Sequence, residues 1–264
     1  MAAVKDFFEL RPEERWHLFS DDKTKPLRVS NYYLRVEGEK DKVTMWSETL
    51  AHPWDPANDV IAHLLPRNPP HYREIANEYG KEIGWLMRQL LSLISQGLGL
   101  KKDTLQTRIG EKPRLVSQSN YYPPCPQPQL TMGLPPHTDL NALTVLMQSE
   151  NVTGLQVIKD GEWVSVDPVP DAFIVNIGDQ IQVLSNGRYK SVHHRAVTNK
   201  DSERISIAMF YGPNKDTIMG PMKDLIDEEH PPVYRNYRHG EFLNEFHKQE
   251  GTWRRVKEAF ELQH

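Results

Sequence analysis

His137 and Asp139 stand two residues apart in the stretch GLPPHTDLNALTVL, directly before an apolar run that is typical of a strand. Both side chains can bind transition metals, and two histidines with one carboxylate form the ligand set of many non-haem iron(II) oxygenases. Residues two apart on a strand point to the same side, so one strand end could present both ligands to one ion. The triplet alone is a weak signal, because most H-x-D sequences belong to polar turns.

A third ligand has to come from elsewhere in the chain, and the segment KSVHHRAV offers two candidates. Alternation along a strand places His193 on one face of this segment and His194 on the other. Both faces are similarly apolar, so periodicity does not decide between the two histidines. The other histidines lie in helical or irregular segments and are interpreted as surface or packing residues.

Two further polar pairs are spaced two apart within apolar segments: Arg204 with Ser206, and Asn120 with Tyr122. An inward arginine within a sheet is unfavourable unless it meets an anion. Its planar guanidinium suits a carboxylate, and a serine hydroxyl can add a further hydrogen bond. With the candidate metal ligands, these pairs predict a metal ion beside a bound carboxylate.

Strands must position these residues, and the second half of the chain is rich in short β-like segments separated by Gly, Pro, Asn or Asp. Many short strands at regular spacing predict a sandwich or barrel. We therefore expect a mainly β fold with flanking α-helices, in which helices pack outside a double-stranded β-helix (jelly-roll) core. The predicted strands are 114–122, 142–148, 154–158, 162–169, 172–179, 180–187, 191–197 and 204–212.

The strongest helix prediction covers residues 72–98, where apolar residues recur at helical spacing and Gly97 and Gly99 suit the C-terminal end. A short helix interrupted near Pro12 is expected at 4–19, and an amphipathic helix at 239–262. The proline-rich residues 20–70 are expected to be irregular, with a strand at 32–36 and a helical turn at 60–65. These patterns predict three regions: a helical and irregular 1–113, a catalytic core 114–222 and a helical 223–264.

The composition of the 264 residues is ordinary for a globular protein, with 38% hydrophobic and 26% charged residues. A net charge of −4 gives no electrostatic reason to expect nucleic acid as a partner. Cys125 is the one cysteine, so no intramolecular disulfide is possible and a reducing compartment fits. The sequence shows neither an apolar run long enough to span a bilayer nor a signal-peptide core. We expect a cytoplasmic monomer with no membrane contact.

The stretches NYYPPCPQPQLTMGLPPHTDLNALTVLMQ, NIGDQIQVLSNGRYKSVHHRAV and ERISIAMFYGP resemble a known family. They are similar to the plant iron(II)/2-oxoglutarate-dependent dioxygenases of specialised and hormone metabolism, in the branch with flavonoid, salicylate and alkaloid oxygenases. The resemblance runs from Tyr72 to Phe260. Its motifs are specific, because H-x-D, the distal histidine and R-x-S follow in the family's order and spacing.

The resemblance implies that His137, Asp139 and His194 are the iron ligands and the catalytic centre, since the family's distal ligand is the histidine directly before arginine. Arg204 and Ser206 match the pair that holds the far carboxylate of 2-oxoglutarate.

Asn120 and Tyr122 match polar positions beside the cosubstrate. Phe210 matches an aromatic position that packs against the substrate, with plain core packing as the alternative. The implied cofactors are Fe(II), 2-oxoglutarate and O2, with ascorbate supporting activity. The implied reaction hydroxylates or desaturates a small, largely apolar metabolite while 2-oxoglutarate is decarboxylated to succinate and CO2. Phenolic, flavonoid, alkaloid and terpenoid substrates all remain open.

One departure concerns the beginning of the chain. Family members usually open with a strand of the PVIDL kind and a later GFFQVVNHG-like segment, and neither is present. VKDFFELRPEERW resembles the helix that follows them, so we expect the family's opening segment to be missing and apolar surface to be exposed. Two alternatives therefore stand beside the oxygenase: a catalytically impaired binding relic, and a cupin-like zinc or manganese protein. Arg204 and Ser206 argue against the second alternative, because they have no role without an anionic cosubstrate.

Overall fold

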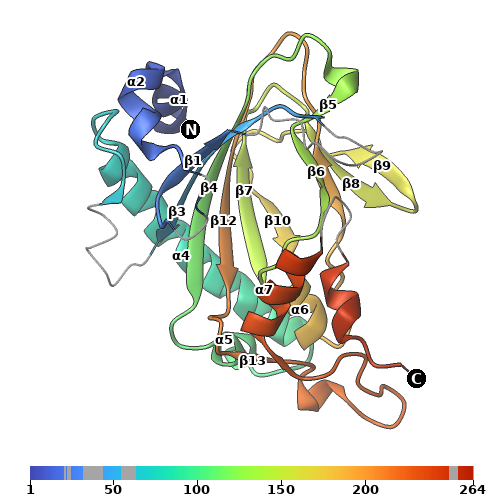
Figure 1. Cartoon of the computed structure of the whole chain (residues 1–264). Helices are drawn as coiled ribbons and strands as arrows, with labels where there is room; N and C mark the ends of the chain where they lie inside the picture. The colour runs from blue at the N-terminus through green and yellow to red at the C-terminus, as the bar shows by residue number, and fades with distance from the viewer. Residues whose placement is uncertain (21, 23–24, 32–43, 55–63, 250–254, 264) are drawn as a thin grey trace.

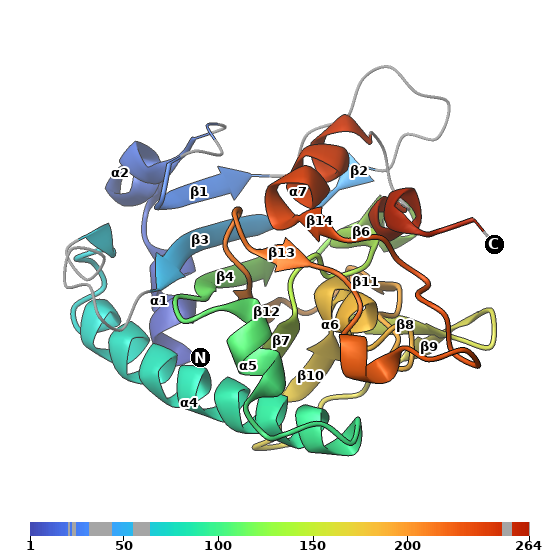
Figure 2. The same ribbon diagram turned by 90° about the horizontal axis from the view of Figure 1, so that it is seen from below.

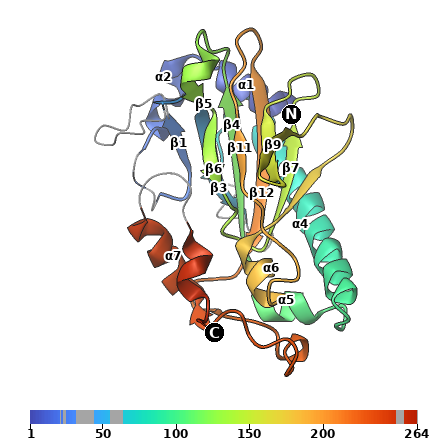
Figure 3. The same ribbon diagram turned by 90° about the vertical axis from the view of Figure 1, so that its right-hand side faces the viewer.

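Two β-sheets lie face to face, with helices on the outside and at one end (Figures 1 and 3). The computed structural model describes residues 1–20, 22, 25–31, 44–54, 64–249 and 255–263. Its strands are β1 (Arg28–Asn31), β2 (Thr44–Met45), β3 (Glu48–Trp54), β4 (Arg114–Tyr122), β5 (Thr131–Met132), β6 (Leu134–His137), β7 (Leu143–Gln148), β8 (Leu155–Lys159), β9 (Glu162–Ser165), β10 (Ile174–Ile177), β11 (His194–Ala196), β12 (Arg204–Gly212), β13 (Ile218–Met219) and β14 (Tyr237–Arg238). Its helices are α1 (Ala2–Glu9), α2 (Pro12–Arg15), η1 (Trp16–Leu18), α4 (Tyr72–Gly97), α5 (Thr104–Ile109), η2 (Pro128–Leu130), α6 (Asp179–Leu184), η3 (Lys223–Leu225), α7 (His239–Lys248) and η4 (Val256–Phe260).

The larger sheet has the strand order β1-β3-β4-β12-β7-β10, and the smaller has the order β6-β11-β8-β9. Leu146 of β7 and Ala208 of β12 pack against Leu155 of β8, so side chains of the two sheets meet between them. This arrangement confirms the predicted jelly-roll core with flanking helices.

The long helix α4 covers the outer face of the larger sheet (Figure 2). Met87 and Leu91 on this helix are fully buried in one cluster with Val145 of β7 and Met209 of β12. Burying each of these side chains contributes about 2 kcal/mol, so the helix braces the strands that carry the inward-facing polar residues. Among the described helices, none is long and apolar enough to cross a membrane.

The predicted strand at 180–187 is wrong, because residues Asp179–Leu184 form helix α6. All six of its residues are buried, so the segment shows no polar face from which a helical period could be read. Gly178, in extended conformation, precedes the helix and begins the turn.

The expectation that 20–70 is irregular is also wrong in part, because β1 and β3 extend the larger sheet beyond β4. Prolines such as Pro53 had suggested a break, yet Pro53 lies beyond the residues of β3 that pair with β1, and among the described strands it has β4 as its one neighbour. The strand expected at 32–36 lies outside the described residues, as does most of the helical turn at 60–65. The C-terminal helix is divided into α7 and η4 around residues 250–254, which the structure does not describe.

Candidate metal centre

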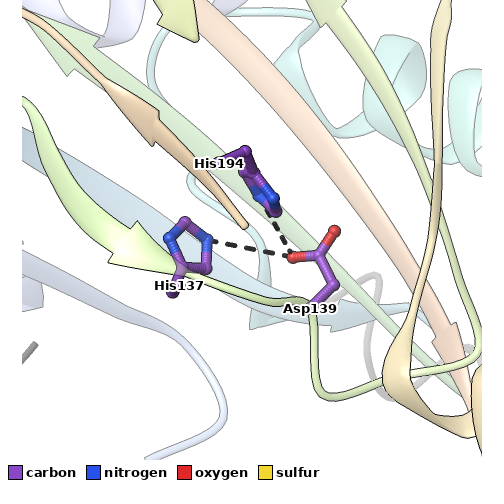
Figure 4. Close-up of side chains that lie close together, drawn as sticks. All are labelled: His137, Asp139 and His194. Atoms are coloured by element: carbon purple, nitrogen blue, oxygen red, sulfur yellow. Dashed lines mark ion pairs between the residues drawn. The ribbon is translucent and has the colours of Figure 1, made fainter. Parts of the chain in front are cut away.

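Two histidines and one aspartate converge on the inner side of the smaller sheet (Figure 4). His137 is the last residue of β6 and His194 the first residue of β11, and the two are paired directly across these antiparallel strands. Their rings lie 4.2 Å apart between centroids. Asp139 lies beyond the end of β6, in the turn toward β7. The expectation that one strand carries both residues of the H-x-D triplet is therefore wrong; a strand end and the turn after it carry them.

The distances between the three side chains match a shared ion. Nε2 of His137 lies 3.9 Å from Oδ1 of Asp139, and Nε2 of His194 lies 3.7 Å from the same oxygen. One ligand atom from each residue falls within 4.8 Å of the others. His193 is not part of this group, so the geometry selects His194 where alternation along the strand left both histidines open.

Each histidine ring is held by its other nitrogen. Nδ1 of His137 donates to the carbonyl oxygen of Pro135 at 2.8 Å, and Nδ1 of His194 donates to that of Val192 at 3.2 Å. A carbonyl oxygen can only accept, so both protons are on Nδ1 and both Nε2 lone pairs are free to bind a metal. Such bonds from the second nitrogen are usual for histidines that bind metals.

Burial lowers the pKa of His137 below its usual value, and His194 makes a smaller contribution in the same direction. The negative charge of Asp139 has the opposite effect and raises the pKa. The ring is therefore neutral at neutral pH, and its contact with Asp139 is not an ion pair under these conditions. A neutral imidazole is the form that binds a metal ion.

Asp139 has two different oxygen environments. Oδ2 accepts hydrogen bonds from Oγ1 of Thr144 at 2.8 Å and Nδ2 of Asn176 at 3.3 Å, and these two donors are neighbours across β7 and β10. Oδ1 is the oxygen that faces the histidines. The carboxylate is thus oriented to offer one oxygen to an ion. Thr144 and Asn176 were not predicted from the sequence, because their role depends on strand register.

A second anchor holds the backbone around Asp139. The amide of Asp179, at the start of α6, donates to the carbonyl oxygen of Asp139 at 2.8 Å. Its side chain accepts from Oγ1 of Thr138 at 3.1 Å and from Nζ of Lys257 at 3.2 Å. Burial raises the pKa of Asp179, and Lys257 opposes this effect. A buried ion pair therefore fixes the central residue of the H-x-D triplet.

The predicted polar pairs face each other across two adjacent strands of the larger sheet. Arg204 is paired with Tyr122, and Ser206 with Asn120, between β12 and β4. All four residues are buried. The guanidinium carbon of Arg204 lies 5.2 Å from the centre of the Tyr122 ring. The structure thus brings together the four residues that the sequence had placed on separate segments.

Arg204 is a buried cation whose guanidinium donates a hydrogen bond to a neutral amide. It is 3% exposed, its Nη2 donates to Oε1 of Gln148 at 2.7 Å, and its Nε has no partner among the described residues. Burial lowers its pKa, and the opposing effect comes from Tyr122 rather than from a carboxylate. Gly154 makes room for the side chain, because a Cβ there would lie 2.6 Å from Cδ of Arg204.

The amide of Asn120 is oriented by its neighbours. Its Oδ1 accepts from Oγ1 of Thr49 at 3.1 Å and from Nε2 of Gln118 at 2.9 Å, which leaves Nδ2 directed to Oγ of Ser206 at 3.5 Å. Thr49 belongs to β3, a strand that the sequence did not predict. Phe210 is half-buried and packs against the cluster between the sheets that contains Leu146.

Known proteins are similar to this chain in sequence and in fold. A family model described as the 2OG-Fe(II) oxygenase superfamily matches residues 113–213. Protein DOWNY MILDEW RESISTANCE 6 from Arabidopsis thaliana is 43% identical over 249 residues, which cover 93% of this chain and 72% of that protein. Flavanone 3-dioxygenase 2 from Oryza sativa subsp. japonica is 43% identical over 246 residues, which cover 93% of this chain and 70% of that protein.

A crystal structure of JOX2 in complex with 2OG, Fe and JA superimposes with a TM-score of 0.88 at 34% identity, covering 99% of this chain and 77% of that chain. The intact His-Asp-His triad accompanies this likeness in sequence and fold. With these relatives and this triad, the chain belongs to the plant 2OG-Fe(II) oxygenases and is an Fe(II)/2-oxoglutarate-dependent dioxygenase.

Proposed function

We propose that this enzyme hydroxylates or desaturates a small, largely apolar plant metabolite while 2-oxoglutarate is converted to succinate and CO2. The observation that carries the proposal is the pairing of two features on the inner faces of the sheets. One is a triad of metal ligands, and the other is a buried arginine without an acidic partner among the described residues. An impaired relic has no need to keep both features, so the intact pair favours turnover.

The residues present fit the iron ion. His137, Asp139 and His194 offer two imidazole nitrogens and one carboxylate oxygen, which is the facial ligand set that leaves other coordination positions open. The hydrogen bonds to Pro135 and Val192 keep both imidazoles in the tautomer that binds a metal.

The residues present also fit 2-oxoglutarate. Nε of Arg204 is buried and has no hydrogen-bond acceptor in the part of the chain that the structure describes, and a carboxylate would supply an acceptor and a negative charge. Arg204 and Ser206 would hold the far carboxylate, and Asn120 and Tyr122 would lie beside it. A bound iron ion supplies the activation of O2, which places one oxygen atom in succinate and leaves the other for the product or for water.

The chain's own contribution is to bind, orient and exclude water. Phe210 lies on the same face of β12 as Arg204 and Ser206, which supports its placement against the substrate. The relatives named for flavanone and the JOX2 complex with JA support a small organic substrate, and they leave open which one this enzyme accepts. We also propose that the enzyme is a cytosolic monomer and that ascorbate supports its activity.

The test is an anaerobic titration of the purified protein with ferrous iron and 2-oxoglutarate, followed by the weak visible charge-transfer band of the iron chelate. We expect the band to appear with the wild type and to be absent from His194→Ala, which should keep the wild-type circular dichroism spectrum. Phenolic, flavonoid, alkaloid and terpenoid compounds are then screened for substrate-dependent release of succinate. A folded wild-type protein without the band would instead support the relic.

A further inference from the structure

A fourth polar side chain completes a row across the inner face of the larger sheet. Ser206 of β12 is paired with Asn120 of β4 on one side and with Gln148 of β7 on the other, and Asn120 is paired in turn with Thr49 of β3. Gln148 is the last residue of β7 and is 9% exposed. It is adjacent to the two residues, Arg204 and Ser206, that the proposed function assigns to the far carboxylate of 2-oxoglutarate.

The orientation of the Gln148 amide is fixed by Arg204. A guanidinium has donors and no acceptor, so the atom of Gln148 that lies 2.7 Å from Nη2 of Arg204 must be the oxygen Oε1. The nitrogen Nε2 is therefore the other end of the amide. It is shielded from solvent and has no hydrogen-bond partner among the described residues.

Gln148 and Arg204, which share a hydrogen bond, therefore each carry a donor without an acceptor among the described residues. These donors are Nε2 of Gln148 and Nε of Arg204. A buried donor without an acceptor destabilises a protein by about 1–3 kcal/mol, so such atoms require an explanation. Both atoms can only donate, and no carboxylate of the described residues is among the groups that act on Arg204. A single anion with several acceptor oxygens would satisfy all of these requirements.

We propose that Gln148 is an additional cosubstrate-binding residue, which donates a hydrogen bond from Nε2 to the far carboxylate of 2-oxoglutarate while its Oε1 holds the guanidinium of Arg204 in place. The inference rests on the proposed placement of that carboxylate at Arg204 and Ser206. Asn120 and Gln148 then flank Ser206 on its two neighbouring strands, one carboxamide on each side.

The first test compares two ligands in the Gln148→Met variant, which keeps the side-chain length and removes both polar atoms. Anaerobic titrations of the Fe(II)-loaded protein measure the dissociation constants of 2-oxoglutarate and of 2-oxopentanoate, which has a methyl group in place of the far carboxylate. We expect 2-oxoglutarate to bind about 10-fold more weakly, equivalent to about 1.4 kcal/mol, and 2-oxopentanoate to bind as in the wild type. An equal change for both ligands, or no change for either, would overturn the proposal.

Gln156→Met is the matched control. Gln156 of β8 also accepts a hydrogen bond from an arginine, Nε of Arg195 at 2.8 Å, but it lies on the smaller sheet in register with Arg195 rather than with His194. It should leave the affinity for both ligands unchanged. If the wild type itself gives no 2-oxoglutarate chelate, then the proposed function fails, whereas a wild type that binds and a Gln148→Met variant that binds equally well refute the role of Gln148 alone.

A second measurement looks for the proposed hydrogen bond in the wild-type protein, so it does not depend on ligand binding by a variant. In protein labelled with 15N at the glutamine side chains and loaded with Zn(II), the amide proton signals of Gln148 are identified by their loss in Gln148→Met. We expect one of them to move downfield when 2-oxoglutarate is added and to stay in place with 2-oxopentanoate. If 2-oxoglutarate leaves the signal unmoved, the donated bond does not form and Gln148 only positions Arg204.

Discussion

Oγ1 of Thr144 donates a 2.8 Å hydrogen bond to Oδ2 of Asp139, the carboxylate oxygen that faces away from the two histidines. The bond makes the two oxygens of Asp139 unequal, because Oδ2 is occupied by Thr144 and Asn176 while Oδ1 remains available. Outer partners of this kind typically change metal affinity by 10- to 100-fold when they are removed.

Thr144→Val is therefore expected to weaken Fe(II) binding by about 10-fold, since valine has the shape of threonine without its hydroxyl. The measurement is a competition titration for Fe(II) or Mn(II) with a chelator of known affinity. Thr144→Ser keeps the hydroxyl and should bind the metal nearly as well as the wild type. Equal metal affinity in the valine variant would show that Asn176 alone is sufficient to orient Asp139.

Lys257→Met should destabilise the fold strongly, because it leaves the buried carboxylate of Asp179 without its cationic partner. Removing one partner of a buried ion pair costs about 3–5 kcal/mol, and urea denaturation would measure the loss. Lys257→Met combined with Asp179→Asn should recover part of it. The pair of the exposed Lys248 and the half-buried Glu245, 3.9 Å apart, provides the comparison: Lys248→Met should change stability by less than about 0.5 kcal/mol.

Gly80→Ala should destabilise the protein, although alanine normally favours a helix over glycine by about 1 kcal/mol. Gly80 lies in α4 against the indole of Trp54, and a Cβ at this position would overlap three atoms of that ring. We expect a loss of about 1–3 kcal/mol in the free energy of unfolding. Combining Gly80→Ala with Trp54→Leu should recover part of this loss, and a failure to do so would exclude the indole as its cause.

His52 makes stability depend on pH, because burial lowers its pKa to about 4 from the ordinary 6.5. The unfolded chain takes up a proton on this residue below pH 6.5, while the folded chain stays neutral down to about pH 4. Stability is therefore unaffected by His52 above pH 6.5 and falls below it by about 1.4 kcal/mol per pH unit. His52→Leu should reduce the slope of the free energy of unfolding against pH. Between pH 6 and pH 5 the reduction should correspond to the uptake of about one proton. An unchanged slope would mean that the imidazole is protonated within the fold.

The strands that the sequence predicted most accurately are the two longest. β4 and β12 begin and end at the predicted residues, since each is a β-rich run of nine residues that a proline follows directly. Helix α4 ends one residue before its predicted end. β6 was not predicted, because LPPH contains two prolines, and these are tolerated because β6 is the edge strand of the smaller sheet.

The sequence predicted which residue types form the candidate site and how they are spaced along the chain. The pairing of Arg204 with Tyr122 and of Ser206 with Asn120 agrees with the inward-facing pairs that alternation indicated. The supporting residues could not be found in this way. Thr144, Gln148 and Asn176 are ordinary polar residues within strands, and their roles come from register between strands, which a single sequence does not encode.

The polar row of Thr49, Asn120, Ser206 and Gln148 has a consequence for how the protein folds. Its four members come from distant parts of the chain, so every contact in the row closes a long loop. The row as a whole is complete only after β3, β4, β12 and β7 have all paired. During refolding, the capacity to bind 2-oxoglutarate should therefore return after the helical signal of α4, and the cosubstrate should slow unfolding without accelerating the early steps of folding.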